Sequence, residues 1–513
     1  MGHLRIILPD QLDRSYIPDW IKEGDTVLIA ETGYLFAEAT HKRKLAFLCS
    51  AGRHFAAELS EAGVDVIHRR IADGSHTRSL ADHVASAVDE CGADALAVHR
   101  PGSFMELEEL EAAAKEASLD LTVDEDLSFY STPREFAEHI SGRKQVVMEY
   151  FYRELRKRHN VLMEIGEPAG GDWNYDKENR QTFGKEGPGE VPPPFFVRPD
   201  EITGNAIREV EEVFSDNPGS LDGFALAVTP EDAKNALSDF VTNRLPNFGA
   251  YQDAMWTDNS FLFHSFLSPL LNTRLLSPRE AVAAAEAAYR SGDAPVNSVE
   301  GFIRQIIGWR EFIRGVYYQQ GPDYLALNEL AADREVPESF WTGETDMACI
   351  SSTVSHILAT GYAHHIQRLM VMGLFAQLAG VHPYHFHRWH LALYLDAYDW
   401  VSAPNVIGMS QYADGGFLAT KPYVASGKYI KRMSNYCKAC RYSPDEAVGE
   451  TACPFTTLYW DFLLRHRSML DENRRMNFQM KNLERKTDDQ LRQIRERARE
   501  VLSRLPANRS ETP

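Results

Sequence analysis

Four of the six cysteines in this chain are spaced like the ligands of a metal site. Cys437 and Cys440 form a C-x2-C pair, Cys453 follows with a proline directly after it, and Cys349 lies upstream. Four thiolates can bind either a tetrahedral zinc ion or an iron–sulfur cluster. A thioredoxin-type redox pair would need a strand–helix setting, which the helical pattern of this region does not provide. The spacing therefore favours a metal site and leaves zinc and iron both open.

The adjacent residues His364 and His365 are a second candidate for chemistry, within a helical pattern that covers 353–379. Successive residues of a helix point about 100° apart, so one imidazole could face a pocket while the other packs beneath it. An imidazole with a pKa of about 6.5 is a natural proton donor near neutral pH. A buried histidine is more often a core residue than a catalyst, so the pair alone does not establish proton transfer.

Three further segments combine residue types that bind ligands. In 264–269, Ser265 and Ser268 offer two hydroxyls just before a predicted helix, where free backbone N–H groups can bind phosphate. The glycine-rich, aromatic run 415–423 is a surface loop on which a flat ligand or a base could stack. The histidine-rich run 382–390 has no carboxylate or cysteine at ligand spacing, so we do not expect a metal there.

The elements that must position these residues differ between the two ends of the chain. In the first 130 residues, β-rich runs alternate with segments of helical periodicity such as 42–62 and 80–91. This alternation predicts a parallel, Rossmann-like sheet covered by helices on both faces, with ligand-binding loops at its carboxyl edge. The expected strands are 4–8, 26–31, 64–68, 95–99 and 119–123.

The rest of the chain is almost wholly helical in pattern. Gly and Pro are concentrated in 166–171 and 184–194, which indicates a connecting region. We expect an α/β domain over 1–130, a linker with helices and loops over 131–229, and a large all-helical domain over 230–513. The strongest predicted helices are 233–244, 281–290, 301–317, 353–379, 452–467 and 482–505.

The overall charge and hydropathy narrow the class of partner. The formal net charge is −20, which counts against a nucleic-acid partner, although an acidic protein can still carry a local basic groove. No stretch approaches the roughly 18 apolar residues of a membrane span, and the apolar run at the N-terminus is too short for a signal peptide. We therefore expect a cytoplasmic protein with no membrane partner.

Together these motifs resemble the photolyase/cryptochrome superfamily. The run 309–312 resembles its W-R-E-F helix, and 264–269 resembles its T-S-x-L-S loop for the FAD phosphates. His364, His365 and Arg368 resemble the H-H-x-x-R of (6-4) photolyases. With the four cysteines, the chain is similar to the iron–sulfur bacterial branch, the prokaryotic (6-4) photolyases and cryptochromes, also described as deoxyribodipyrimidine photolyase-related proteins.

The resemblance implies a photolyase/cryptochrome fold, in which the α/β domain binds an antenna and the all-helical domain binds FAD. Near the FAD phosphates it implies Tyr251, His264, Ser265, Leu267 and Ser268. Around the flavin it implies Gln305, Arg310, His365, Arg368, Asp396 and Asn405.

The resemblance also implies roles for the remaining candidates. The antenna, in this branch typically 6,7-dimethyl-8-ribityllumazine, would bind near Pro9, Asp10, Gln11, Glu31 and Lys44. Trp389 and Trp341 would relay electrons from the surface to the photoexcited flavin. A [4Fe–4S] cluster would be held by Cys349, Cys437, Cys440 and Cys453.

The implied activity is that of a (6-4) DNA photolyase, a lyase, acting as a monomer on UV-damaged DNA. The excited reduced flavin would donate an electron to a flipped-out (6-4) pyrimidine–pyrimidone lesion, and His364 or His365 would supply a proton. Tyr423 and Tyr429 would form the wall that faces the lesion. Local positive charge for the DNA phosphates would come from Arg153, Arg156, Lys157, Arg158, Arg180 and Lys421.

Two other functions stay open. A cryptochrome photoreceptor would have the same fold and cofactors with a signalling output, and a light-independent iron–sulfur DNA-binding module would lack flavin. Two residues depart from the family patterns: Leu369 stands where eukaryotic (6-4) enzymes have a further histidine, and His390 stands beside Trp389 where this branch usually has tyrosine.

Overall fold

The computed structural model describes residues 2–37, 39–143 and 146–505. Within them, the N-terminal part contains a parallel sheet with strand order β3-β2-β1-β4-β5. All four neighbouring pairs of this sheet are parallel, so the expected Rossmann-like arrangement is confirmed. The strands are β1 (His3–Ile7), β2 (Thr26–Ala30), β3 (Asp65–Arg69), β4 (Ala95–His99) and β5 (Asp120–Asp124).

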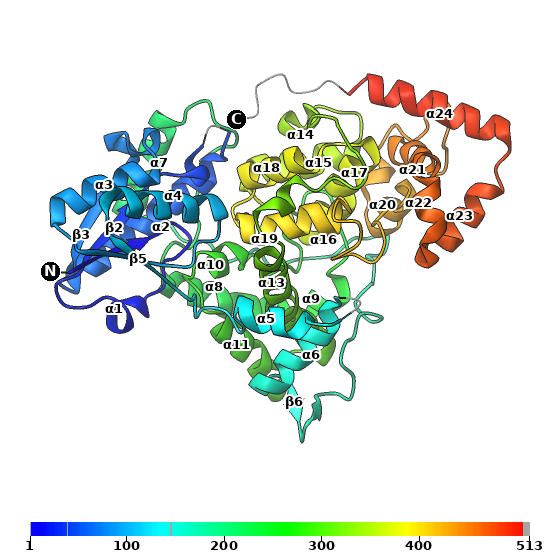
Figure 1. The fold of residues 1–513 in the computed structure, drawn as a ribbon. Coiled ribbons are helices and arrows are strands. Elements are labelled where there is room, and N and C mark those ends of the chain that lie inside the picture. The colour runs from blue at the N-terminus through cyan, green and yellow to red at the C-terminus, as the bar shows by residue number, and fades with distance from the viewer. Residues whose placement is uncertain (1, 38, 144–145, 506–513) are drawn as a thin grey trace.

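Helices cover both faces of this sheet. Successive side chains of a strand point to opposite faces, and in these strands both sets are apolar. Leu4 and Ile6 pack toward α3 (Leu80–Cys91) and α4 (Phe104–Ala117). Val27 and Ile29 belong instead to the large core that includes α2 (Lys42–Glu61) and α7 (Glu201–Val213). That core continues into the helical part of the chain, which lies beside the sheet in Figure 1.

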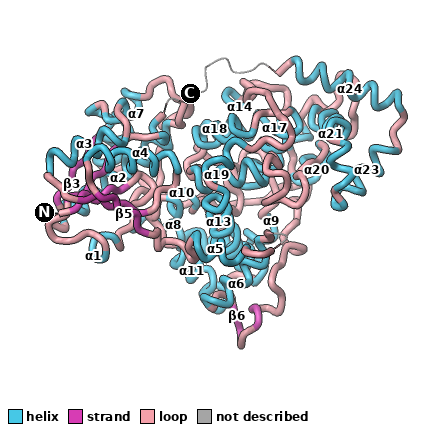
Figure 2. The backbone as a smooth tube through the Cα atoms, in the orientation of Figure 1, coloured by secondary structure: helices cyan, strands magenta, loops and turns pink. Residues whose placement is uncertain are grey.

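The remainder is helical apart from a two-stranded hairpin, β6 (Met163–Glu164) with β7 (Glu167–Pro168), at the lower tip of Figure 2. The other helices are α1 (Tyr16–Asp19), α5 (Pro133–Ile140), α6 (Met148–His159), α8 (Pro230–Asn243), α9 (Leu245–Tyr251), α10 (Ser268–Asn272), α11 (Pro278–Ser291), α12 (Val296–Ile303), α13 (Glu311–Gln320), α14 (Ser339–Thr342), α15 (Ala348–Thr360), α16 (His365–Gln367), α17 (Leu374–Ala379), α18 (Pro383–Leu393), α19 (Asp399–Ala403), α20 (Gly427–Met433), α21 (Pro454–Arg465), α22 (Arg467–Glu472), α23 (Asn477–Glu484) and α24 (Asp488–Ser503).

Three stretches of the helical part have π-helical hydrogen bonding. They are Arg304–Arg310 between α12 and α13, Arg368–Gly373 between α16 and α17, and Pro404–Ser410 after α19. The prediction of one regular helix over 301–317 was therefore too simple. Such π segments are rare and often mark functional sites, since the wider turn redirects side chains.

The prediction of a continuous helix over 353–379 is wrong. Helix α15 ends at Gly361, whose φ of +67° lies in the left-handed region, and a Cβ there would lie 2.8 Å from Leu395. His364 is extended, with φ −73° and ψ 162°, and His365 starts a new helix. The two histidines are thus not neighbours on one helix. The predicted helix over 482–505 is also broken, because Thr487 caps a separate α24.

Buried polar contacts hold the sheet domain against the helical part. The Lys44 ammonium, from the start of α2, donates to the carbonyls of Leu391 and Ala397 at 2.8 and 2.7 Å. Arg274 pairs with the carboxylates of Asp10 and Asp126. The proposed boundaries 1–130, 131–229 and 230–513 stay a prediction. None of the helices in the described residues is long and apolar enough to cross a membrane.

Candidate functional site

An ion pair between Arg368 and Asp396 joins three parts of the helical region. The guanidinium contacts the carboxylate at 2.8 and 3.2 Å, and the Ser268 hydroxyl donates to the same carboxylate. The Asn272 amide donates to the Asp396 carbonyl at 2.9 Å. Burial by itself would raise the pKa of Asp396, but the Arg368 charge and the hydrogen bonds hold it below its usual range. Asp396 therefore stays a carboxylate.

His264 and His364 stack in the interior, with ring centroids 4.3 Å apart and planes 11° apart. Among the described residues, neither ring nitrogen of His364 has a hydrogen-bond partner, and Nε2 of His264 also lacks one. Burial, and then the charge of His365, lowers the pKa of His264 to about 3. Burial also lowers the pKa of His364 well below its usual value. Both rings are therefore uncharged near neutral pH.

His365 differs from its neighbour because its side chain is exposed. Burial, and then the Arg368 charge, nevertheless lowers its pKa to about 4. The His365 ring is thus reached by solvent although the surrounding protein weakens its hydration. Of the two histidines, His365 is the one that an approaching molecule can touch.

The three π-helical segments each contribute a predicted flavin-contact residue. Gln305 is exposed and donates to the Gly301 carbonyl at 3.0 Å. Asn405 is half-buried and donates to the Val401 carbonyl at 2.8 Å. Arg368 begins the third segment, which contacts the segment that contains Asn405. The segments that contain Arg368 and Asn405 therefore lie side by side, whereas a place for Gln305 beside them stays a prediction.

Arg310 points toward the sheet domain. Its guanidinium lies over the rings of Phe129 and Trp400, at 3.9 and 5.2 Å from their centroids. It also donates to the Leu271 carbonyl at 3.4 Å. Burial lowers the pKa of Arg310 to about 9, while its Nε and Nη1 have no hydrogen-bond partner among the described residues. A contact between Arg310 and a flavin stays a prediction.

The remaining predicted FAD residues cluster near α9 and α10. Tyr251 stacks on Phe183 with ring centroids 4.6 Å apart. Leu267 is buried, and its N–H donates to the Ser265 hydroxyl at 3.3 Å. The sequence interpretation of 264–269 as a turn into a helix is correct, since α10 starts at Ser268.

The chemistry of this donor set fits FAD. Hydroxyls from Ser265 and Ser268 suit phosphate oxygens, and the charged Arg368–Asp396 pair suits a polar ring edge. The orphaned nitrogens of the stacked histidines are buried polar atoms that a ligand could satisfy. Glycine also permits close packing here, because a Cβ on Gly373 would lie 2.2 Å from the Ser410 hydroxyl.

The four cysteines line one small pocket, which the structure brings together from separate elements. A Cβ on Gly427 would lie 2.8 Å from the Cys453 sulfur, so this close approach requires glycine. Burial raises the pKa of Cys437 to about 12 and that of Cys453 to about 11. Within the described residues, no group of three His, Cys, Asp or Glu side chains is spaced to hold a metal ion. Four convergent thiols suit either one tetrahedral ion or an iron–sulfur cluster.

The two predicted relay tryptophans are connected through Phe340. Trp389 is fully buried, and its indole N–H donates to the Phe340 carbonyl at 3.2 Å. Trp341, the next residue, is half-buried at the edge of the core. The ring of His390 lies 5.6 Å from that of Trp389, and burial lowers the pKa of His390 well below its usual value. The electron-relay role stays a prediction.

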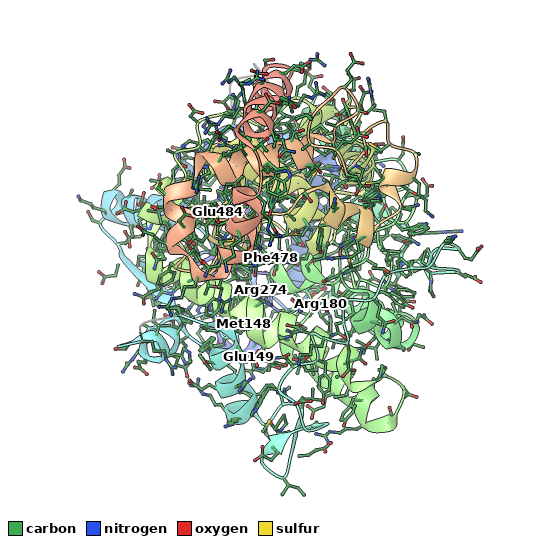
Figure 3. All side chains as sticks on the ribbon, turned by 90° about the vertical axis from the view of Figure 1, so that its right-hand side faces the viewer. Met148, Glu149, Arg180, Arg274, Phe478 and Glu484 are labelled. Carbon is green, nitrogen blue, oxygen red and sulfur yellow. The ribbon has the colours of Figure 1, made fainter. Side chains whose placement is uncertain are left out.

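Tyr423 and Tyr429 lie close to the exposed Arg180. Tyr423 is 37% exposed and Tyr429 is half-buried on α20. Burial raises the pKa of both phenols, and the Arg180 charge counteracts the rise in both. Figure 3 views the molecule from the side of α23, with Arg180 between the labelled residues Phe478 and Met148. The charges that act on the two phenols thus include the carboxylates of Asp176 and Asp253 as well as Arg180.

The proposed basic contacts on α6 need correction. Arg156 is fully buried and donates to the carbonyls of Val161 and Trp173, each at 3.3 Å, so it cannot contact DNA. Arg158 pairs with Glu135 and Glu154, and Arg153 pairs with Glu149. Sequence patterning could not separate these structural arginines from exposed ones such as Arg180. Lys157 and Lys421 are exposed and half-buried, respectively.

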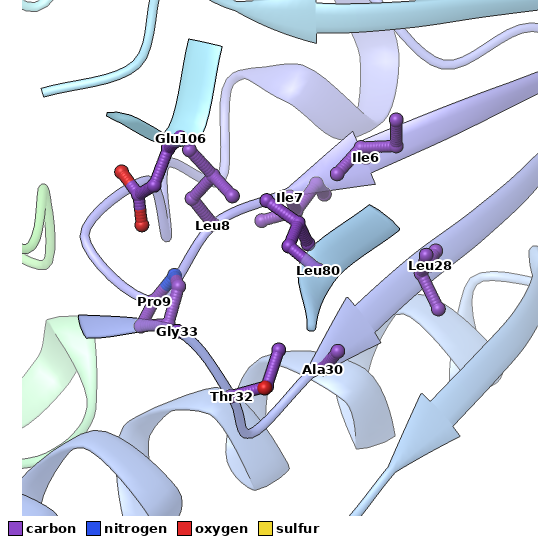
Figure 4. Close-up of a pocket in the computed structure, with 10 residues that line it drawn as sticks. All are labelled: Ile6, Ile7, Leu8, Pro9, Leu28, Ala30, Thr32, Gly33, Leu80 and Glu106. Carbon is purple, nitrogen blue, oxygen red and sulfur yellow. The ribbon is translucent and has the colours of Figure 1, made fainter. Parts of the chain in front are cut away.

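A second pocket lies at the carboxyl ends of β1 and β2. Figure 4 shows Pro9, Thr32 and Gly33 around its rim, with the Glu106 carboxyl directed toward the Pro9–Gly33 side. Apolar side chains form the rest of the wall, and Glu106 is only 6% exposed. Burial, and then the charge of Asp10, raises the pKa of Glu106 well above its usual value. The pocket's volume of about 10 Å³ leaves room for about one water molecule, so in this structure it is too small for a heteroaromatic ligand.

Of the predicted antenna residues, Pro9 lines this pocket and four have contacts elsewhere. Asp10 pairs with Arg274, and Gln11 donates to the His99 carbonyl at 2.9 Å. Glu31 forms two hydrogen bonds with Arg53, at 2.7 and 2.9 Å. Lys44 joins the two domains, as described above. Contact of these residues with an antenna stays a prediction.

Sequence reasoning missed several residues of these sites. The Asn272 amide donates to the Asp396 carbonyl, and the Gln367 amide oxygen accepts from the backbone N–H of His364. Tyr436 adjoins Cys437 and lines the cysteine pocket. Glu106 has only one sequence signal, its position near the start of a helix that follows a strand. One sequence signal could have indicated Gln367, since it is a polar residue within the H-H-x-x-R motif, directly before Arg368.

Comparison with known proteins gives consistent results. Residues 5–226 match the family described as deoxyribodipyrimidine photo-lyase-related protein. A relative from Agrobacterium fabrum, named (6-4) photolyase, is 46% identical over 98% of this chain and 100% of its own length.

Solved structures show the same fold at low sequence identity. A bacterial class III photolyase from Agrobacterium tumefaciens superposes with a TM-score of 0.59 at 14% identity, covering 92% of this chain and 98% of the other. A cryptochrome from Synechocystis sp. PCC6803 superposes with a TM-score of 0.55 at 15% identity, covering 84% and 88%. The expected combination of an α/β domain with a helical domain is confirmed.

Proposed function

Because the chain belongs to the deoxyribodipyrimidine photolyase-related family, we propose that it is a (6-4) photolyase, a lyase that uses light to repair (6-4) pyrimidine–pyrimidone photoproducts in UV-damaged DNA. The observation that carries this proposal is the full-length similarity to the Agrobacterium fabrum (6-4) photolyase. The exposed His365, near the Arg368–Asp396 ion pair, gives the proposal a chemically suitable site. The protein would act as a monomer in the cytoplasm.

His365 is the proton donor in this proposal, and His364 supports it. His365 is exposed, whereas His364 is buried and stacked on His264. In free protein His365 is neutral near pH 7, since its pKa is about 4. Nearby DNA phosphates would favour the imidazolium form, and the ring N–H of His365 would then donate to the lesion and recover the proton at the end.

FAD would be the cofactor of the helical domain, where it would supply the light-driven electron. Ser265 and Ser268, with Tyr251, His264 and Leu267, would hold its phosphate region. The Arg368–Asp396 pair, Gln305, Arg310 and Asn405 would orient the ring and exclude water from it. The charge of Asp396 would be kept by Arg368 throughout, because both groups are buried and paired.

The cysteine pocket would hold a [4Fe–4S] cluster rather than zinc. Supporting this are the four thiols on one pocket and the resemblance of the cysteine pattern to the iron–sulfur branch of the family. Binding would require all four sulfurs as thiolates, so loading would release protons. We propose a structural role, since the ligands Cys349, Cys437, Cys440 and Cys453 tie together distant parts of the chain.

The antenna would be 6,7-dimethyl-8-ribityllumazine, bound near the loops that follow β1 and β2. The neutral Glu106 carboxyl could donate or accept a hydrogen bond at the heteroaromatic ring. Pro9, Asp10, Gln11, Glu31 and Lys44 would act from the surrounding loops.

Damaged DNA would approach the face that carries Arg180, Tyr423 and Tyr429. Exposed Arg180 and half-buried Lys421 would contact phosphates, which offsets the unfavourable net charge locally. The tyrosines would contact the flipped lesion by stacking.

The deciding experiment illuminates the reduced holoprotein with an oligonucleotide that contains one (6-4) lesion. Chromatography and mass spectrometry should detect the two restored pyrimidines after light and none in the dark. The His365→Asn variant should bind the same lesion without restoring it. Full flavin photochemistry with no restored pyrimidines would instead identify a cryptochrome photoreceptor, and purified protein without flavin absorbance would favour a light-independent DNA-binding module.

A further inference from the structure

A line of hydrogen bonds connects the cysteine pocket with the histidine pair. Tyr436 lines the pocket, and its hydroxyl accepts a hydrogen bond from Nε2 of Gln367 at 3.0 Å. The other end of the same amide, Oε1 of Gln367, accepts from the backbone N–H of His364 at 3.2 Å. All three residues are at most 1% exposed. Water therefore cannot replace either bond.

The chain itself makes a second connection between the same two places. Cys349 lies in the first turn of α15, and the C-terminus of α15 leads directly into the segment with His364. Helix α15 also packs against the turn Tyr436–Lys438, which contains Cys437. The cysteine pocket thus holds the beginning of the helix whose end presents the histidines.

The amide of Gln367 must take one orientation for these bonds to form. The backbone N–H of His364 can only donate, so the amide oxygen has to face it. The amide nitrogen then faces Tyr436, whose hydroxyl oxygen is the acceptor. Removing the hydroxyl would leave a buried N–H without a partner, a state that proteins avoid. Tyr436 is therefore what holds the Gln367 amide in register with His364.

We propose that Gln367 and Tyr436 are positioning residues that couple the four-cysteine pocket to the proton-donating histidine pair. Gln367 fixes the extended backbone of His364, which holds the ring of His364 on His264 and sets the direction of the adjacent, exposed His365. A ligand that immobilises Cys437 immobilises the adjacent Tyr436 as well. The catalytic meaning of this coupling rests on the proposed repair function, whereas the coupling itself does not.

Hydrogen exchange of the purified full-length protein tests the coupling directly. Tyr436→Phe should raise the exchange rate of the backbone amides in 361–367 by about fivefold, the factor that one buried hydrogen bond is worth. Tyr442→Phe is the matched control, because Tyr442 lines the same pocket and lacks the contact with Gln367. It should leave the exchange of this segment unchanged. Equal exchange in wild type and Tyr436→Phe would overturn the proposal.

Removal of bound metal provides an independent arm. Treatment of the wild-type protein with an iron chelator should raise exchange in 361–367, because Tyr436 is no longer held by its neighbour. The same treatment of Tyr436→Phe should add little to the increase that the substitution already causes. An equal increment in both proteins would show that the pocket acts on the histidine segment by another route.

Substitution of Gln367 separates positioning from general damage. Gln367→Leu removes both hydrogen bonds and should lower kcat for repair while leaving KM for lesion DNA and the rate of flavin photoreduction unchanged. Gln367→Glu should recover part of kcat, since one carboxylate oxygen can accept from His364 and the other from the Tyr436 hydroxyl. If Gln367→Leu also raised KM and slowed photoreduction, and Gln367→Glu restored none of these, Gln367 would be a structural residue only. If wild-type protein repairs no lesion, the proposed function fails, and the exchange results still decide the coupling.

Discussion

The parallel rings of His264 and His364, 4.3 Å apart, join two segments that are distant in the sequence. One contributes the hydroxyls expected at the FAD phosphates, and the other contains the proton donor. The contact is compatible with two neutral rings, whereas two imidazolium cations stacked in the interior would repel each other. The arrangement of the site thus requires that His264 and His364 are both uncharged.

This dependence predicts that stability falls as the pH is lowered from about 6.5 toward about 4. Unfolded histidines take up protons near pH 6.5, whereas the buried His264 does so in the fold only at about 3. The unfolded state then binds more protons in this window, which favours unfolding by up to about 1.4 kcal/mol per pH unit and histidine. Urea midpoints at pH 7 and pH 5 measure the effect, and His264→Gln should reduce it. Equal midpoints at the two pH values would contradict this account.

Asp396→Asn should release FAD and destabilise the protein. The substitution keeps the shape but leaves the Arg368 guanidinium without its charge partner, at a cost of about 3 kcal/mol for a largely buried pair. Flavin absorbance after gel filtration and the urea midpoint measure the two effects. Asp489→Asn is the control, because its pair with Arg492 is exposed and such pairs contribute less than about 1 kcal/mol. Retention of flavin in Asp396→Asn would exclude this ion pair from the flavin site.

Gly427→Ala should lower the iron content of the purified protein by displacing Cys453. The added methyl would lie 2.8 Å from the sulfur, well inside van der Waals contact. Gly184→Ala is the control, since nothing lies within 4 Å of a Cβ there. Iron and acid-labile sulfide analysis compares the two variants. If zinc alone is found in the wild type, the pocket binds a single ion and the cluster assignment fails.

Trp389→Phe and His365→Asn should impair different steps. The buried Trp389 is proposed to carry electrons inward, so its loss should stop photoreduction of oxidised flavin by an external donor. The same variant should still repair lesions once its flavin is reduced chemically in the dark. His365→Asn should show the opposite pattern. Loss of both activities in Trp389→Phe would mean that the tryptophan mainly supports the fold.

Arg180→Glu should weaken binding to lesion DNA. It should also reduce the slope of the logarithm of the binding constant against the logarithm of the salt concentration by about one, the value for one phosphate contact. Arg180 is exposed next to the tyrosine wall, and reversal of its charge repels the backbone. Arg495→Glu on α24 alters the net charge equally on an exposed helix and serves as the control. Fluorescence anisotropy at two salt concentrations would distinguish a local contact from a net-charge effect. Equal weakening by both variants would indicate the latter.

Much of the architecture follows from local patterns in the sequence. The alternation in Leu4–Ile7 and Thr26–Ala30 determines two buried faces, and therefore strands with helices on both sides. Serine and threonine caps such as Ser79 determine where helices start. The C-x2-C pair also favours a metal site, because residue type and short spacing limit the chemistry, although they leave zinc and iron both open.

Only the tertiary structure decided how these residues are arranged. Gly361 interrupts a periodicity that predicted one helix, since Leu395 leaves no room for a Cβ. It thereby separates a buried His364 from an exposed His365. The sequence predicted that Arg156 is an exposed cation, but in the structure it is buried and donates to two backbone carbonyls. The bond between Gln367 and Tyr436 joins residues far apart in the chain, and no local pattern encodes such a contact because it depends on how complete helices pack.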